Sequence, residues 1–213
     1  MYLPPHFNAK DRAFAVELMQ THPLASLISN DDDGLPFVSH LPLHVEERGD
    51  DVLVLLGHCA KPNPHWRYLR ARPTAVVTFL GPHAYMSPKV YPDLVRVPTW
   101  NYLAVHCTVQ ATLIEDPLAK DRLLKKLIGD HDTPYIQQWL NLGPAYQHKM
   151  LAGIVGFELQ VTGLQCKLKL NQHRSEAHAT MRAGYATGND NERALGEWMD
   201  KLGIGAQSEN RPG

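Results

Sequence analysis

Four residues with different chemistry follow one another closely at Gly57, His58, Lys61 and Asn63. They come after an aliphatic run and before a segment with helical spacing that begins near Pro64. The first turn of a helix has unpaired backbone N–H groups and a positive dipole end, and Lys61 adds a full charge. Gly57 would let a ligand approach the backbone closely. The corner is therefore a candidate anion site, with phosphate the commonest ligand, although an ordinary turn accounts for the same residues equally well.

A second polar group is the stretch Ser39-His40-Leu41, followed by His44. On one strand, His40 and His44 would lie roughly 13 Å apart on the same face, which is too far for one metal ion. We therefore predict no metal site here. Ser39 and His40 fit better as a polar edge that faces a ligand.

Two later segments could complete a pocket. Trp100 and Asn101 open a predicted strand after a proline-rich loop, and an asparagine between large rings suits a planar heterocycle. Gln172 and Arg174 could reach a phosphate or a carbonyl edge. A purely structural role for the aromatic residues, or a solvated basic turn, also remains open. Taken together, these residues favour a binder of a planar, phosphorylated cofactor.

Other chemistry finds little support. No serine stands in a nucleophile-elbow context, and adjacent strand residues such as His58 and Cys59 point to opposite faces. The net charge of −1 indicates no nucleic-acid or membrane surface. Three widely spaced cysteines argue against a disulfide framework or a zinc ribbon and favour a reducing cytoplasm. No apolar run is long enough for a signal peptide or a membrane span.

The elements that would position these residues are mainly strands joined by short turns, with helices late in the chain and at its edges. This order favours an antiparallel barrel with added helices over a doubly wound α/β sheet, and no dinucleotide or Walker motif is present. We expect strands over 22–30, 35–47, 52–58, 73–81, 101–116 and 153–170, and helices over 9–20, 63–72, 117–131 and 133–142, with a third short one from Pro144 and a last helical region that Ser175 caps.

Six segments in order resemble the PaiB-type family of FMN-binding negative transcriptional regulators, relatives of the pyridoxamine-phosphate-oxidase-like split barrels. They are MYLPPHF, SHLPL, GHCAKPNPHW, YMSPKVY, VPTWNYLAVH and KLKLNQHRSEAH, spread over residues 1–178. The resemblance implies a six-stranded antiparallel split β-barrel of the α+β class, mainly β with added helices. It also implies a homodimer with FMN at the interface between the subunits.

The same resemblance assigns roles to individual residues. Ser39, His40 and Leu41 would line the isoalloxazine ring, Gly57 and His58 would flank it, Lys61 and Asn63 would contact the phosphate, Trp100 and Asn101 would help to close the pocket, and Gln172 and Arg174 would reach the flavin of the partner subunit. Related flavin oxidases often carry an arginine for the phosphate where this chain has His40. Other groups must then hold the phosphate, or it is held less tightly.

The domain and function that we expect follow from this reading. One FMN-binding domain should cover residues 1–204, with a helical segment from about residue 173 and a polar tail over 205–213. DNA as a partner rests on the resemblance alone, because the only basic cluster of the region 117–142 is RLLKK and no helix-turn-helix is evident. A flavin-dependent oxidoreductase is the alternative function. A haem-handling split barrel with a histidine ligand is another.

Overall fold

The computed structural model describes residues 1–49, 52–93 and 95–205. The predicted tail over 205–213 lies outside the described residues except for Gly205. None of the helices in this described part of the chain is long and apolar enough to cross a membrane.

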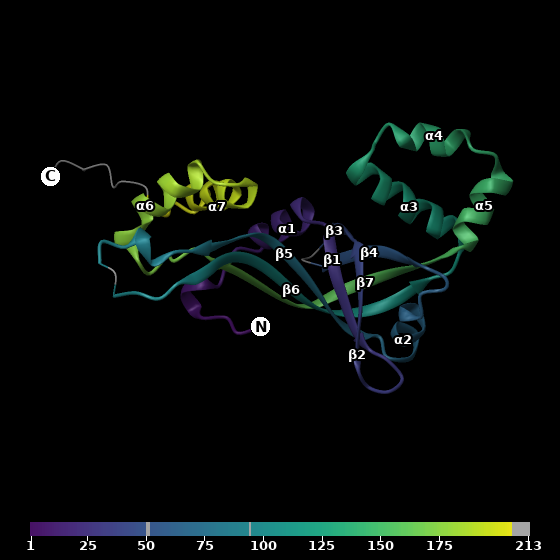
Figure 1. The fold of residues 1–213 in the computed structure, drawn as a ribbon. Coiled ribbons are helices and arrows are strands. Elements are labelled where there is room, and N and C mark those ends of the chain that lie inside the picture. The colour runs from purple at the N-terminus through teal and green to yellow at the C-terminus, as the bar shows by residue number, and fades with distance from the viewer. Residues whose placement is uncertain (50–51, 94, 206–213) are drawn as a thin grey trace. The chain divides into compact units, whose positions relative to one another are not determined.

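Seven strands form one sheet in the order β2-β1-β5-β6-β7-β4-β3 (Figure 1). The strands are β1 (Leu24–Asn30), β2 (Pro36–Pro42), β3 (His44–Arg48), β4 (Val52–Ala60), β5 (Thr74–Met86), β6 (Thr99–Ile114) and β7 (Ile154–Lys169). The helices are α1 (Arg12–Thr21), α2 (His65–Ala71), α3 (Pro117–His131), α4 (Tyr135–Asn141), α5 (Pro144–Ala152), α6 (Ser175–Ala186) and α7 (Asp190–Lys201), with short 3₁₀ turns at η1 (Pro5–Phe7) and η2 (Pro88–Val90).

The chain divides into two compact units. The first unit contains Met1–Phe14, Leu80–Ala104 and the chain from Cys166 onward, and the second contains Ala15–Phe79 and Val105–Gln165. The prediction of one domain over residues 1–204 stays a prediction.

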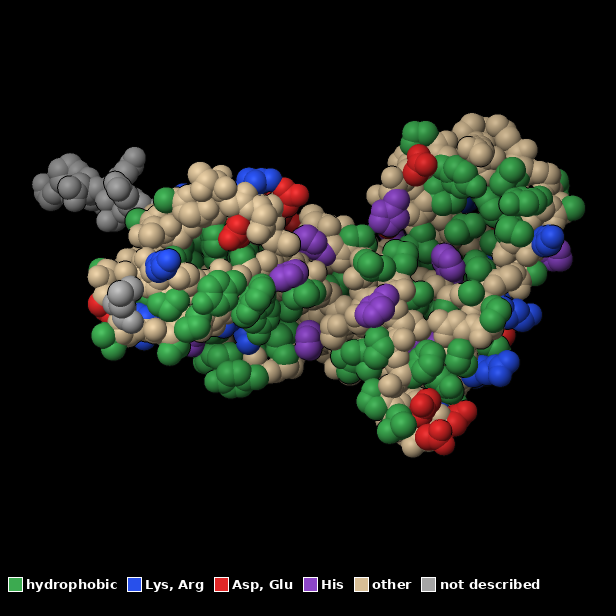
Figure 2. Space-filling view, viewed as in Figure 1, with side chains coloured by type: hydrophobic (Ala, Val, Ile, Leu, Met, Phe, Trp, Pro, Cys, Tyr) green, Lys and Arg blue, Asp and Glu red, His purple; other side chains and the backbone are tan. Residues whose placement is uncertain are grey.

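The second unit holds β1 to β4 with α2 to α5. Its fully buried side chains include Leu27, Leu43, Leu55, Phe79 and Phe157. The β1–β2 hairpin turns at the acidic residues 31–33, which Figure 2 shows as a red group exposed at its tip. Helix α3 packs on β4, where Leu123 and Leu127 form a cluster with Val54 and Leu56.

The first unit contains the C-terminal part of β5, the N-terminal part of β6 and the C-terminal end of β7, together with helices α6 and α7. Its core includes Leu103, Leu170, Met181, Leu195 and Met199. Helix α7 begins with a capping box in which Asn189 and Glu192 satisfy each other's backbone N–H groups. This capping box fixes the start of α7 at Asp190, shortly after α6 ends at Ala186.

Several expected boundaries were wrong for identifiable reasons. The stretch 35–47 is two strands, because the chain breaks at Leu43 between β2 and β3, so His40 and His44 lie on different strands. Helix α1 begins at Arg12 rather than at residue 9, because the chain just before it is extended and Asn8 pairs with Lys167 in an isolated β-bridge. Strand β5 continues past Gly81 and Pro82 to Met86. The sheet thus has seven strands rather than six.

Candidate functional site

Ser39 and Asn63, both predicted as site residues, are in contact in the second unit. The Asn63 side-chain amide donates to Ser39 Oγ at 3.0 Å. His65 joins them: its Nδ1 lies 2.9 Å from Ser39 Oγ, and its Nε2 lies 3.0 Å from Ser29 Oγ. We call Ser29, Ser39, Asn63 and His65 the Ser39 cluster. This cluster ties the β1–β2 hairpin to the start of α2.

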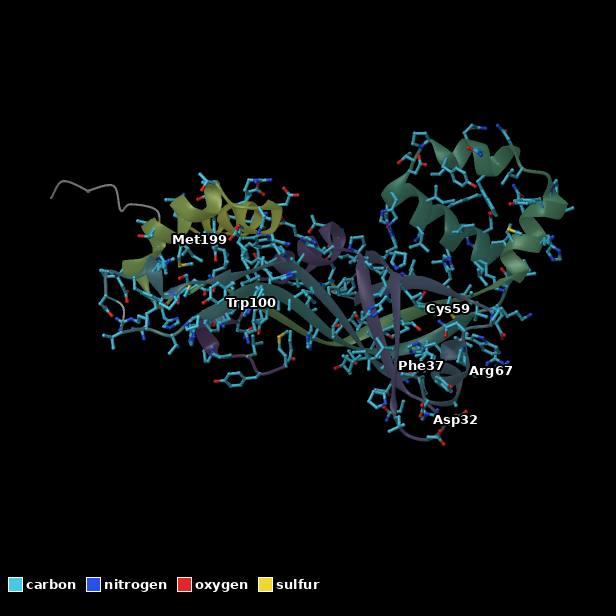
Figure 3. All side chains as sticks on the ribbon, in the orientation of Figure 1. Asp32, Phe37, Cys59, Arg67, Trp100 and Met199 are labelled. Atoms are coloured by element: carbon cyan, nitrogen blue, oxygen red, sulfur yellow. The ribbon has the colours of Figure 1, made fainter. Side chains whose placement is uncertain are left out.

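His65 is the member of this cluster that sequence reasoning did not select. Its side chain is fully buried, and burial lowers its pKa from 6.5 to about 4. A neutral imidazole offers one donor and one acceptor, which suits one hydroxyl on each side. The ring also packs edge-on against Phe37 of β2, which is labelled in Figure 3. A histidine four residues before Leu69 on the buried helix face was the available signal.

The first turn of α2 differs from the open anion site that the sequence suggested. Its N–H groups have partners, because His65 N–H donates to Asn63 Oδ1 at 3.0 Å and Trp66 N–H reaches the Cys59 sulfur. The N–H groups of Arg67 and Tyr68 both point to the Pro64 carbonyl. Any anion at this corner must therefore be held by side chains.

Lys61 supplies the charge at that corner. Its backbone is fixed on both sides, since its N–H donates to Gly153 O at 2.8 Å and its carbonyl accepts from Trp66 Nε1 at 3.0 Å. Its side chain is exposed, and the described residues give its ammonium group no ion-pair partner. A fixed backbone with an uncommitted cation is a suitable arrangement for recognising a phosphate.

Gly57 and His58 lie side by side on β4 and have different surroundings. A Cβ atom on Gly57 would stand 2.4 Å from Leu43 Cδ2 and 3.0 Å from Phe157 Cε2, so tight packing explains the glycine on that side. His58 is half-buried and its Nδ1 is buried with no hydrogen-bond partner in the described part of the chain. Burial lowers the pKa of His58, so the imidazole is neutral near pH 7.

The three residues Ser39, His40 and Leu41 do not all face the same way. Ser39 is buried and Leu41 half-buried, whereas His40 is exposed on the opposite face of β2. There His40 Nδ1 lies 3.0 Å from the Ser26 hydroxyl. That each of these residues contacts the isoalloxazine ring stays a prediction, and Ser39 and Leu41 share a face of β2 that His40 does not.

Trp100 and Asn101 open β6 in the first unit and face opposite sides of it. Trp100, labelled in Figure 3, is 53% exposed, and its ring centroid lies 6.3 Å from that of Tyr85. Asn101 is fully buried, and its amide donates to the Tyr185 hydroxyl at 2.9 Å. Asn101 thus has a structural contact beneath α6, and its predicted role toward a cofactor stays a prediction.

Gln172 and Arg174 follow β7 in the same unit. The Gln172 side chain turns back to its own strand, where it donates to the Leu168 carbonyl and accepts from Leu170 N–H at 2.9 Å. Arg174 is exposed, and its one ion pair within the described part of the chain is a long one of 4.0 Å to Glu176. Helix α6 begins at Ser175, with Arg174 as the cap residue, so the predicted cap at Ser175 was wrong by one position.

The eleven predicted cofactor residues fall into two groups. Seven of them, from Ser39 to Asn63, belong to the second unit, and the four others belong to the first. Within residues 1–49, 52–93 and 95–205, no three His, Cys, Asp or Glu side chains gather in a way that could hold a metal ion.

Comparison with known proteins shows the family to which this chain belongs. The family described as "Putative FMN-binding domain" matches residues 1–163. The chain is also 36% identical over 179 residues to protease synthase and sporulation protein PAI 2 of Bacillus subtilis, covering 83% of this chain and 84% of that one. This chain belongs to the FMN-binding domain family. The resemblance to PaiB-type proteins and the expected cofactor, FMN, are both confirmed.

Solved structures agree on the architecture. The FAD and heme binding protein from Mycobacterium smegmatis has a TM-score of 0.59 at 19% identity, covering 89% of this chain and 80% of that one. The flavocytochrome Anf3 from Azotobacter vinelandii has a TM-score of 0.58 at 18% identity, covering 76% and 69%. At such identities the likeness concerns the fold alone. The α+β split barrel is confirmed, with one strand more than expected.

The residues of the second unit fit the chemistry of FMN. A phosphate requires a cation and hydrogen-bond donors, which Lys61 and the second N–H of the Asn63 amide can supply. A flavin ring edge carries alternating donors and acceptors, and the unpartnered His58 Nδ1 could pair with it.

Proposed function

We propose that this chain is a PaiB-type, FMN-dependent regulatory protein that works as a homodimer, with the cofactor held where β4 meets α2. The observation that carries the proposal is Lys61, whose backbone is fixed by Gly153 and Trp66 while its ammonium group has no ion-pair partner in the described chain. This cation lies within the segment that matches an FMN-binding domain. When bound, FMN supplies electron or hydride transfer.

The chain's own residues then have distinct tasks at this corner. Lys61 neutralises the phosphate, and the Asn63 amide donates to it with the N–H that Ser39 does not use. His65 holds Ser39, and so fixes the angle of Asn63, without itself carrying charge. His58 offers a neutral ring nitrogen to the flavin edge. This is an arrangement in which rigid neighbours orient a small number of polar contacts.

The outer face of β2, β1 and β5 is suited to a second copy of the chain. In the strand register Val38 lies opposite Ile28, and Ile28 lies opposite Val76, so these residues form one row across three strands. Val38 and Val76 are 46% and 38% exposed, and Leu24 nearby is 67% exposed. An exposed apolar sheet face of this kind favours a symmetric contact, in which the same surface serves both subunits.

Regulation is the role that the name of the Bacillus subtilis relative suggests, and we propose an indirect route for it. The two lysines of the basic cluster in α3 are already engaged: Lys125 pairs with Asp121 at 2.6 Å, and Lys126 pairs with Glu46. They are poorly available for DNA phosphates. We also propose a cytoplasmic location, where the three buried free cysteines would stay reduced.

Replacing Lys61 tests the cofactor site. Lys61→Ala should weaken FMN binding by about 1.5–3 kcal/mol, because a charge-assisted contact is lost. Flavin fluorescence quenching measures the affinity. Lys149→Ala is the matched control, since Lys149 is an exposed lysine of α5 in the same unit. Equal FMN affinity in wild type and Lys61→Ala would remove Lys61 from the site.

Replacing Val38 tests the dimer. Val38→Glu should put a charge into the apolar row and give monomers in sedimentation velocity, with weaker FMN binding if the cofactor lies at the interface. Leu118→Glu is the control, because Leu118 is 69% exposed on α3, away from this row. A Val38→Glu protein that remains dimeric would rule out this face as the interface.

DNA binding tests the route of regulation. We expect the protein to bind DNA from a gene that it regulates no better than unrelated DNA, at any ionic strength, in fluorescence anisotropy. Affinity that is specific for that DNA and falls steeply with salt would indicate direct contact with phosphates and would contradict the indirect route.

A further inference from the structure

The first unit contains a hollow of about 400 Å³. None of its lining residues belongs to the FMN site that we propose in the second unit. The lining of the hollow includes Tyr2, Tyr91, Arg96, Lys169, His173 and Arg174. These residues come from the N-terminal segment, the stretch before β6, and the end of β7 with the turn that follows. We call it the cationic hollow. Its volume is in the range of small-molecule sites.

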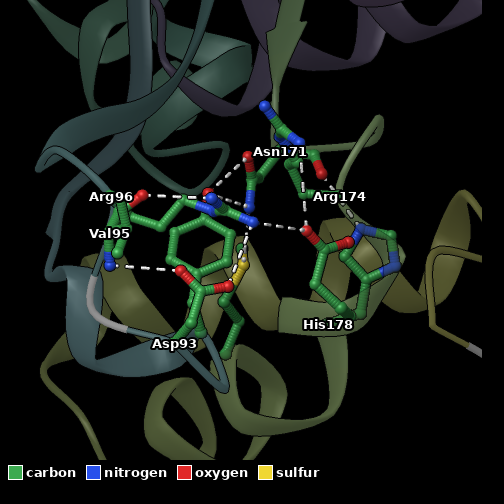
Figure 4. A network of polar contacts seen from close by, with 9 residues as sticks. Asp93, Val95, Arg96, Asn171, Arg174 and His178 are labelled. Atoms are coloured by element: carbon green, nitrogen blue, oxygen red, sulfur yellow. Dashed lines mark hydrogen bonds and ion pairs between the residues drawn. The ribbon is translucent and has the colours of Figure 1, made fainter.

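Positive charge exceeds negative charge around this hollow. Arg96 pairs with Asp93 at 3.2 Å and with Glu176 at 3.9 Å, and Glu176 is shared with Arg174 at 4.0 Å. Figure 4 shows these side chains as one connected network around Asn171. Two carboxylates therefore serve two arginines here, and none remains for the lysines.

Lys169 also lines the hollow but takes no part in these ion pairs. Its Nζ donates to the Thr99 hydroxyl at 2.6 Å, and the described residues place no carboxylate within 4 Å of it. Lys167 lies on the same side of β7, and the ammonium groups of both lysines are within 6 Å of the Tyr102 ring. Burial, and the charge of Lys167, lower the pKa of Lys169. Two adjacent ammonium groups without a carboxylate cost stability unless an anion joins them.

Flat surfaces accompany this charge. The Arg96 guanidinium lies 5.3 Å from the Tyr91 ring centroid, and the His6 and His173 rings are 4.9 Å apart. Tyr2 is 85% exposed at the rim. Such groups can stack on an aromatic ligand, and guanidinium groups add attraction to its face.

We propose that the cationic hollow binds a small planar aromatic anion, one that carries a phosphate or a carboxylate, in addition to the FMN held by the second unit. The anionic group contacts Lys169 and Arg96, and the ring lies against Tyr91 and His173. This site goes beyond the proposed cofactor role, and it does not depend on whether FMN binds at Lys61.

Three probes separate the parts of this recognition. Phenyl phosphate has both ring and charge, inorganic phosphate has the charge alone, and benzyl alcohol has the ring alone. With the protein as purified, isothermal titration should give phenyl phosphate the highest affinity, at one site per chain. Lys169→Met should weaken it about tenfold or more, as loss of a charge-assisted contact predicts. Lys149→Met, at an exposed lysine of the second unit, should leave it unchanged.

Further measurements keep the result distinct from the FMN site. Arg96→Gln serves as a second variant if Lys169→Met fails to fold by circular dichroism, and it should also weaken phenyl phosphate binding. FMN affinity should be unchanged in both variants. The proposal is overturned if phenyl phosphate does not bind, if it binds wild type and both variants equally, or if it displaces FMN one for one.

Discussion

The Ser39 cluster and the cationic hollow are both polar, but they satisfy their polar groups in opposite ways. In the Ser39 cluster, two hydroxyls, an amide and a neutral imidazole bond to one another, and His65 is fully buried. In the cationic hollow, Lys169 and Arg174 have at most long or neutral partners, and the lining is open to solvent. The first is arranged to hold the backbone still. The second has charge to offer to a ligand.

We therefore expect the Ser39 cluster to contribute mainly to stability and the cationic hollow mainly to ligand binding. A buried neutral network is costly to break, because each lost partner leaves a polar group without a hydrogen bond. Half-exposed cations contribute little to folding, and their long ion pairs are screened by solvent. Substitutions in the two regions should therefore give opposite patterns: large losses of stability with indirect effects on FMN in one, and small changes of stability with direct effects on ligands in the other.

His65→Ala should give the largest effect on stability. It leaves the hydroxyls of Ser29 and Ser39 without their shared partner and opens a cavity beside Phe37, so we expect a loss of about 3 kcal/mol in the free energy of unfolding. Urea denaturation measures it. The exposed His83→Ala should change the value by less than about 0.5 kcal/mol. A loss below about 1 kcal/mol for His65→Ala would mean that the cluster does not hold the backbone.

Acid should weaken the same cluster. The pKa of His65 is about 4 in the folded chain and 6.5 when unfolded, so the unfolded chain binds more protons between these values. Stability present above pH 6.5 is then lost as the pH falls toward 4, by on the order of 3 kcal/mol in all. His65→Gln should lose less over this window in urea titrations at stepwise pH. Parallel pH profiles for the two proteins would contradict the burial of a neutral imidazole.

Gly57→Ala should have an intermediate effect in the second unit. The added methyl group would overlap Leu43 and Phe157, at a cost of about 1–3 kcal/mol. Gly184→Ala, on α6 of the first unit, meets nothing within 4 Å and should stabilise the chain by about 0.5–1 kcal/mol. Thermal melting of the two variants in opposite directions is the expected result. If Gly57→Ala leaves the melting temperature unchanged, the Leu43 side chain moves aside at little cost and tight packing does not explain the glycine.

Arg174→Gln should give the smallest change. Among the described residues its one ion pair, to Glu176, is 4.0 Å long and nearly half-exposed, so the free energy of unfolding should change by less than about 0.5 kcal/mol. A destabilisation as large as that of His65→Ala would erase the contrast between the two regions.

Much of the fold could be predicted from the pattern of residues. The bounds of α3 match the expected 117–131, since Asp116 caps the helix and Pro117 opens it. The predicted strand over 73–81 ends too early, because Gly81 and Pro82 usually indicate a turn. In the structure they lie buried within β5. The break at Leu43 was missed because an apolar residue at that point resembles a continuous strand.

The site was harder to predict than the fold. Sequence spacing indicated a cation at Lys61, but it could not show that Asn63 contacts Ser39, which lies 24 positions earlier in the chain. The orphan nitrogen of His58 and the linking role of His65 depend on burial, which only the folded chain defines. The cationic hollow is lined by residues as far apart in the sequence as 2 and 174, and no local sequence pattern predicts that they lie together.

The absorption spectrum of the freshly purified protein, followed by identification of the released chromophore, tests the central claim most directly. We predict a flavin spectrum and FMN in the released fraction, with a loss of bound FMN in Lys61→Ala. A Soret band with released haem would contradict the cofactor assignment, and so would a colourless protein that takes up no added FMN.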